Sequence, residues 1–315
     1  MYSEPEADFI PLRPLPDQGT IGVVAPSSPV EQNQLERGVA YLRNLGYQVV
    51  TGESCFAREN YLAGSDALRA NDLMHMIDDD NVDAVFCAGG GFGCLRILNM
   101  LDYELIADKR KMIVGYSDIT ALHWAVYAQT GLPGISAGMV ASDFGREQVD
   151  PFFEKWFWPL IRKGNMQIAL PSTDHAPHTA IGTAMAGTVS VLTRLLGSEF
   201  FPRVADPVYI FEDVDEPTHK LEGNLQQCVL AGIFDQVEAI FLGTFTPASR
   251  EPFIDVPTPD AMFDRIFRAV RAPIIKGLDY GHINSKMAVP VGIPVELEIN
   301  RNGTMLTLAT NPFKS

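Results

Sequence analysis

The first half of the chain alternates short apolar runs with amphipathic stretches, and this rhythm limits the folds open to it. The apolar runs have the length and composition of buried strands, and they span residues 20–25, 47–50, 84–88 and 112–116. The stretches between them predict helices at residues 31–45, 65–77, 94–100 and 119–129. A strand–helix repeat of this kind predicts a mostly parallel sheet covered by helices, with right-handed crossovers.

The rhythm changes near residues 163–183, where Pro, Ser, Thr and Gly replace helical periodicity. We interpret 166–183 as a linker between an amino-terminal domain, 1–165, and a carboxy-terminal domain, 184–315. Beyond it we expect strands at 208–211, 239–242, 274–276, 295–299 and 305–308 and helices at 189–196, 221–233 and 261–270. The expected fold class is α/β, with a flavodoxin- or Rossmann-like parallel-sheet domain followed by a mixed α/β domain.

Charge and cysteine usage exclude several classes of function. The chain has 39 acidic residues against 24 Lys and Arg, which argues against nucleic-acid binding and against docking on an anionic membrane. Its four cysteines show no C-x-x-C pair, which favours a reducing compartment. No signal-peptide pattern and no run of 18 uncharged apolar residues is visible, so we expect a soluble, cytoplasmic protein.

Three features rich in Gly or Ser follow predicted strands, at residues 26–28, 89–93 and 115–118. Ligands of open parallel sheets bind outside the carboxyl ends of the strands, so these three features point to one site. The turn AGGGFG does not match a dinucleotide or P-loop motif. It is either a plain tight turn, a phosphate cradle, or a source of backbone N–H donors for an oxyanion.

Ser117, in GYSD, has two interpretations. It is a nucleophile presented on a sharp strand-to-helix turn, or else Ser117 or Asp118 is an ordinary helix N-cap. Ile119 stands where G-x-S-x-G would place its second glycine, which excludes the α/β-hydrolase motif.

A serine nucleophile requires a base and a carboxylate that orients the base. His282 lies in the glycine-flanked loop GLDYGH directly after a predicted strand, and Glu212 closes the strand VYIF. A carboxylate at the end of a buried strand is unusual unless it is paired. The other histidines have structural interpretations, as helix, linker or helix-start residues: His75, His123, His175, His178 and His219. No metal site is expected from them.

Several motifs together resemble the LD-carboxypeptidases and their microcin-immunity relatives, a family of serine peptidases with a Ser-Glu-His triad. The resemblance covers nearly the whole chain and rests on GTIGVVAPSSP, GGGFGCLRIL, VGYSDITAL, YIFEDVDEP, FLGTF and GLDYGHINSKMAVPVG. The resemblance implies an amino-terminal parallel-sheet domain that carries the serine, a carboxy-terminal domain that carries Glu and His, and a homodimer.

Carried over to this sequence, the family triad falls on Ser117, Glu212 and His282. The oxyanion donors implied by the resemblance are the backbone N–H of Asp118 and one from Gly90 or Gly91. Phe92 and Arg96 are candidate substrate contacts, although Arg96 has the alternative role of supporting the glycine turn. Gly89 stands where murein-recycling members often carry Arg, which leaves the substrate open.

The resemblance implies a hydrolase that needs no cofactor and no metal and that removes the terminal D-alanine of a cytoplasmic murein tetrapeptide. Two alternatives remain at this point. One is a microcin-immunity-like amidase that acts on an aminoacyl-nucleotide. The other is a non-catalytic protein that binds a peptide or nucleotide in the glycine turn.

Overall fold

Five parallel strands form the amino-terminal part of the sheet in the computed structural model, which describes residues 9–171 and 175–314. They are β1 (Thr20–Val24), β2 (Gln48–Thr51), β3 (Ala84–Cys87), β4 (Met112–Gly115) and β5 (Gly134–Ser136). Their order in space is β2-β1-β3-β4-β5, and each neighbouring pair is parallel. This is the flavodoxin-like order, in which the chain changes direction across the sheet between β1 and β3. The parallel-sheet fold predicted for this half is confirmed.

Helices connect these strands. They are α1 (Gln32–Asn44), α2 (Asp66–Asp78), α3 (Cys94–Ile97), α4 (Tyr103–Lys109), α5 (Ile119–Thr130) and α6 (Pro151–Lys163). α2 begins where the Ser65 hydroxyl accepts a hydrogen bond from the N–H of Leu68, which caps the first turn. α5 follows Ser117 and is buried along most of its length. Rigid packing of this helix fixes the direction in which the preceding turn faces.

The second half adds four more parallel strands, β7 (His178–Thr188), β8 (Pro207–Glu216), β9 (Ala239–Pro247) and β10 (Ile274–Lys276). β11 (Val289–Asn300) lies between β7 and β5, antiparallel to both, and so joins the two halves into one sheet. β12 (Gly303–Leu308) pairs with β11, and β6 (Gln167–Leu170) pairs with β12. The sheet is therefore mixed, as predicted for this half.

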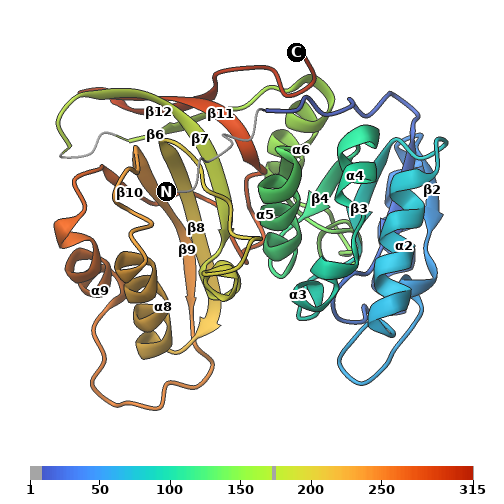
Figure 1. Cartoon of the computed structure of the whole chain (residues 1–315), viewed down its shortest axis with the longest axis horizontal. Helices are drawn as coiled ribbons and strands as arrows, with labels where there is room; N and C mark the ends of the chain where they lie inside the picture. The colour runs from blue at the N-terminus through green and yellow to red at the C-terminus, as the bar shows by residue number, and fades with distance from the viewer. Residues whose placement is uncertain (1–8, 172–174, 315) are drawn as a thin grey trace.

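The helices of the second half are α7 (Val189–Leu192), α8 (Thr218–Leu230) and α9 (Pro259–Ile266). Figure 1 shows α8 and α9 at one end of the long axis of the molecule and α2, β2 and β3 at the other, with β11 and α5 between them. Within the described ranges, no helix is both long enough and apolar enough to cross a bilayer.

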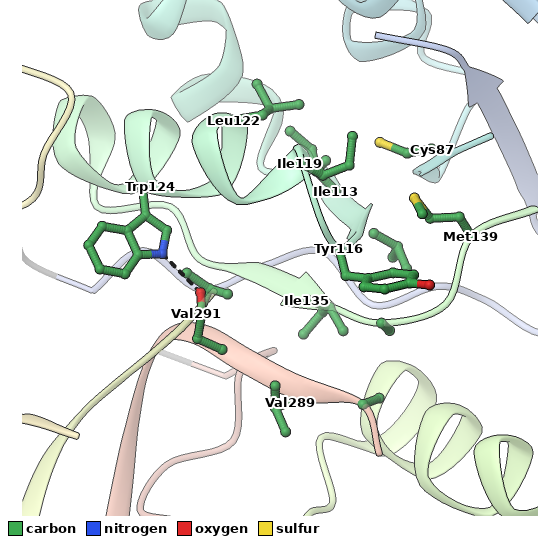
Figure 2. Close-up of a cluster of buried hydrophobic side chains, with 14 of the residues drawn as sticks. Cys87, Ile113, Tyr116, Ile119, Leu122, Trp124, Ile135, Met139, Val289 and Val291 are labelled. Carbon is green, nitrogen blue, oxygen red and sulfur yellow. Dashed lines mark hydrogen bonds between the residues drawn. The ribbon is translucent and has the colours of Figure 1, made fainter. Parts of the chain in front are cut away.

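Buried side chains fill the junction where β11 meets the amino-terminal strands (Figure 2). Ile135 of β5 and Val289 and Val291 of β11 lie in this cluster beside α5. The indole N–H of Trp124 donates to the carbonyl of Ala186 in β7, at 2.9 Å. The two halves therefore share one apolar core at this junction, and that core holds residues that are distant in sequence at fixed positions.

Several elements are absent from the sequence prediction, and the segment 166–183, which we interpreted as a linker, contains strand residues that the sequence did not predict. That segment contains β6 and the first six residues of β7. Both pair with strands more than 100 residues away, and the amino-terminal end of β7 is partly exposed, so no local apolar run marks it. α4, α6 and the three-residue β5 were also missed. The division into two domains stays a prediction.

Candidate active site

Ser117 lies in the turn between β4 and α5, with a backbone φ of +66°. This left-handed conformation costs a residue with a side chain about 1–3 kcal/mol, and such strain is concentrated at functional sites. Asp118 occupies the N-cap position, but its side chain makes no capping hydrogen bond. The interpretation of Asp118 as an ordinary helix cap is therefore wrong, and the turn has the geometry of a nucleophile elbow.

Three side chains from distant parts of the chain form one hydrogen-bonded series. His282 Nε2 lies 2.9 Å from Ser117 Oγ, and His282 Nδ1 lies 2.7 Å from Glu212 Oε2. Glu212 is completely buried, and its other oxygen accepts a hydrogen bond from Thr188 Oγ1 at the end of β7. The Nδ1–H group donates to the carboxylate, which leaves Nε2 free to accept the serine proton. The structure thus brings together the three residues that the resemblance assigns to a triad.

The loop that carries His282 approaches Glu212 closely because residue 281 is glycine. Gly281 has a φ of +125°, and a Cβ added there would lie 2.8 Å from Glu212 Oε2. Any side chain would push the histidine loop away from the carboxylate. Tyr280 fixes the same loop from the other side, because its hydroxyl lies 2.7 Å from Ser136 Oγ of β5.

The glycine turn after β3 lies against the serine. A Cβ added to Gly90 would lie 2.9 Å from Ser117 Cβ and 3.1 Å from Ser117 Oγ. The corresponding position on Gly91 faces Ser28 instead, at 2.4 Å from its Oγ. Gly90 is therefore the residue of this turn that borders the space beside the nucleophile. Which N–H of the turn donates to an oxyanion stays a prediction.

The carboxylate of Asp118 ties together the loops that follow β1, β3 and β4. Its Oδ2 accepts hydrogen bonds from Ser27 Oγ at 2.7 Å and from the Cys94 N–H at 2.8 Å. Burial raises the pKa of this carboxyl group, and its Oδ1 has no hydrogen-bond partner among the described residues. Asp118 thus fixes the glycine turn relative to the serine, a role that the sequence pattern did not indicate.

Phe92 and Arg96 lie at the edge of the glycine turn. Phe92 is 37% exposed and its ring packs edge-on against Tyr61, which is also exposed. The Arg96 guanidinium makes a salt bridge of 2.7 Å with Asp66 of α2. This contact fits the alternative in which Arg96 supports the turn, and substrate contact by either residue stays a prediction.

Position 89 has little room for the arginine that the resemblance leads us to expect there. A Cβ added to Gly89 would lie 2.7 Å from Val30 Cγ1, so a larger residue requires Val30 to move. The charge that an arginine would supply at this place is therefore absent from this chain.

The remaining histidines lie outside the series of Ser117, His282 and Glu212. His75 is exposed on α2, His123 and His175 contact backbone carbonyls, and His178 and His219 each face one carboxylate. His178 opens β7 and so is not the loop residue that the sequence suggested. Among the described residues, no group of three or more His, Cys, Asp or Glu side chains is arranged to hold a metal.

Comparison with known proteins gives the family. The LD-carboxypeptidase N-terminal domain model matches residues 21–137, and the C-terminal domain model matches residues 181–297. A probable murein peptide carboxypeptidase of Bacillus subtilis is 34% identical over 279 residues, which cover 87% of this chain and 86% of that protein. The microcin C7 self-immunity protein of Escherichia coli is 24% identical over 93% of this chain and 94% of its own length.

A solved structure agrees with these matches. The crystal structure of muramoyltetrapeptide carboxypeptidase from Oxalobacter formigenes superposes with a TM-score of 0.86 at 25% identity, covering 93% of this chain and 99% of that one. The family models match both halves of the chain, and the similarity to the B. subtilis relative and to the solved structure points to the same family. The chain therefore belongs to the LD-carboxypeptidase family.

Proposed function

We propose that this protein is a serine carboxypeptidase that hydrolyses an L,D-amide bond and releases the terminal D-alanine of a murein tetrapeptide. The observation that carries the proposal is the hydrogen-bonded series from Ser117 through His282 to Glu212, with the serine on a strained turn. A serine, a histidine and a buried carboxylate in this order form the constellation of acyl-transfer hydrolases.

The proposed reaction uses the arrangement of these three side chains. His282 Nε2 accepts the Ser117 proton as Oγ attacks the carbonyl carbon of the scissile amide, and the negative charge moves to the carbonyl oxygen. The Asp118 N–H and a donor from the glycine turn beside Gly90 stabilise that oxyanion, each worth about 3 kcal/mol. The imidazolium then protonates the nitrogen of the departing D-amino acid, and the C–N bond breaks. Water repeats the sequence on the acyl-enzyme ester and frees the shortened peptide and Ser117.

The choice of substrate rests on the relatives. The B. subtilis relative is named for murein peptides and is 34% identical, whereas the microcin immunity protein is 24% identical. This difference favours the muropeptide over an aminoacyl-nucleotide. The absence of an arginine at Gly89 keeps the second candidate open, because a site without that charge has a weaker preference for an anionic peptide.

We further propose that the enzyme works in the cytoplasm as a homodimer. All four cysteines are free and buried, which suits a reducing compartment. Leu230 at the end of α8 and Phe253 and Ile254 after β9 are exposed apolar side chains that a second copy could cover. Light scattering after gel filtration, with the Ile254→Glu variant as a comparison, tests the dimer.

The decisive experiment offers two substrates to one enzyme preparation. Purified protein is incubated with a murein tetrapeptide and, separately, with an aspartyl sulfamoyl adenosine, and the products are identified by mass spectrometry. We expect free D-alanine and the tripeptide from the first and little or no reaction with the second. Release of aspartate without release of D-alanine would replace this proposal with the immunity-like activity. Ser117→Ala serves as the control in both incubations, since it removes only the nucleophile.

A further inference from the structure

A buried ionic cluster lies directly behind the triad, and the mechanism above does not use it. We call it the Lys286 cluster, and it consists of Lys286, Tyr116 and Asp143. Lys286 is 2% exposed, and its ammonium group donates to Asp143 Oδ1 at 2.7 Å and to Tyr116 Oη at 2.8 Å. The same nitrogen lies 3.9 Å from the centre of the Tyr116 ring, a cation–π distance.

This cluster contacts both sides of the hydrogen-bonded pair of Ser117 and His282. Tyr116 precedes the nucleophile in the chain, and its ring lies against the His282 ring with 4.9 Å between centres and 56° between planes. Lys286 is four residues after the histidine, at the end of the same loop. One ammonium group therefore connects the serine turn to the histidine loop through a ring that touches the base.

Asp143 holds the ammonium from a third element, the short π-helix Val140–Phe144. Its other oxygen accepts hydrogen bonds from the Met139 N–H at 2.9 Å and from Ser142 Oγ at 2.8 Å, so the carboxylate is itself fixed. Burial lowers the pKa of Lys286, and the Asp143 carboxylate opposes that effect. Burial also raises the pKa of the Tyr116 hydroxyl well above its usual range, which keeps it protonated.

Buried ion pairs contribute little net stability, because desolvation of both charges offsets their attraction. A cluster kept only for stability would be served as well by apolar side chains of equal volume. The Lys286 cluster, however, contacts the catalytic pair directly, because its Tyr116 ring packs against the His282 ring. Geometric precision at a nucleophile is worth much in rate, and a shift of about 1 Å can cost about 100-fold.

We propose that Lys286 is a positioning residue, which holds the Tyr116 ring against His282 and thereby keeps the imidazole aligned with Ser117. This inference rests on the proposed function, in which Ser117 is the nucleophile and His282 its base. In this role the Lys286 cluster sets the distance between the serine turn and the histidine loop, and it does not contact the substrate.

The test uses the double variant Lys286→Met with Asp143→Asn, which removes both charges and leaves no buried ion unpaired. The matched control is Lys111→Met. Lys111 is also buried, donates to the carbonyls of Met76 and Asp79, and lies just before β4, at the opposite end of that strand from Ser117. Each protein is characterised by thermal unfolding, by kcat and KM on the tetrapeptide, and by the rate at which a small fluorophosphonate modifies Ser117.

For the double variant we expect kcat and the labelling rate to fall together by about 100-fold, with KM changed less than threefold. Lys111→Met is expected to lower the melting temperature and to leave the labelling rate within twofold of wild type. A folded double variant that is labelled at the wild-type rate overturns the proposal, as does an equal loss in Lys111→Met.

Tyr116→Phe gives a second test if the double variant does not fold. It keeps the ring on His282 and removes only the hydroxyl that accepts from Lys286, so we expect a smaller loss, about tenfold, in the same two rates. Unchanged rates in Tyr116→Phe count against the proposal. Labelling of wild type, absent in Ser117→Ala, does not depend on the true substrate. A wild type that is labelled but does not cleave the tetrapeptide therefore contradicts the proposed substrate and leaves this inference testable.

Discussion

Replacement of Glu212 by Gln tests the most specific part of the geometry. The carboxylate is completely buried and receives one hydrogen bond from His282 Nδ1 and one from Thr188. The amide has nearly the same shape, so the fold should survive. Thr188 donates a hydroxyl hydrogen, which favours the amide oxygen on its side and places the amide NH₂ group opposite His282 Nδ1.

An NH₂ group at that position needs an acceptor, so Nδ1 loses its hydrogen and Nε2 takes it. The imidazole then presents an N–H to Ser117 Oγ and cannot accept the serine proton. In the chymotrypsin type of triad, the wrong tautomer and the lost charge together reduce kcat by about 10⁴. We expect the same order of loss here, equivalent to about 5 kcal/mol of transition-state stabilisation.

The assay is single-substrate kinetics on the tetrapeptide, with unfolding by urea to confirm that the variant is folded. Asp213→Asn is the matched control, because Asp213 is the next residue of β8 and is also buried but bonds to Ser190 instead of His282. We expect that control to keep kcat within about threefold. A folded Glu212→Gln enzyme within tenfold of wild-type kcat would refute the assignment of Glu212 as the group that orients the base.

Three further predictions concern the nucleophile, the glycine turn and stability. Ser117→Ala should abolish turnover while leaving tetrapeptide binding measurable by calorimetry, and equal hydrolysis by wild type and variant would exclude a serine mechanism. Gly90→Ala should reduce kcat at least about 100-fold, because the added Cβ would lie 2.9 Å from Ser117 Cβ. A loss of this size is the range for removal of one oxyanion donor. An unchanged kcat would show that the turn is not part of the oxyanion site. Burial lowers the pKa of His123 to about 4, so the folded state disfavours the protonated ring. The contribution of this residue to the free energy of unfolding is therefore present above about pH 6.5 and is lost as the pH falls toward 4. The loss is about 3 kcal/mol, measurable as a difference in urea unfolding between pH 7 and pH 4, and it should disappear in His123→Gln.

Much of the fold was predictable because β1, β3 and β4 are buried on both faces. Continuous apolar runs mark β1, β3 and β4, and helical spacing marks α1, α2 and α5, without any tertiary information. β6 and the start of β7 carry no such local signal. Their hydrogen-bond partners lie in β12 and β11, more than 100 residues later.

The candidate site likewise contains residues that the sequence indicated and residues that only the structure reveals. Ser117, Glu212 and His282 were nominated from their residue types at strand ends and from the family motifs, and the structure places them within hydrogen-bonding distance. Their catalytic roles stay predictions. The Lys286 cluster had no signal in the sequence beyond a lysine before an apolar run, because a buried ion pair is recognisable only when both partners are seen to share one interior position.

The sequence alone determined the class of the sheet, the strand ends at which chemistry is possible, and the residue types available there. Only the tertiary structure decided that the Asp118 carboxylate bonds to Ser27 and Cys94 instead of capping α5, and that Gly90 rather than Gly91 borders the serine. The physical reason is the pairing of β11 with both β5 and β7, which brings His282 against a serine 165 residues earlier in the chain. Local propensity determines the secondary structure of each segment, whereas contacts of a few ångströms between loops depend on the order and register of all strands in the sheet.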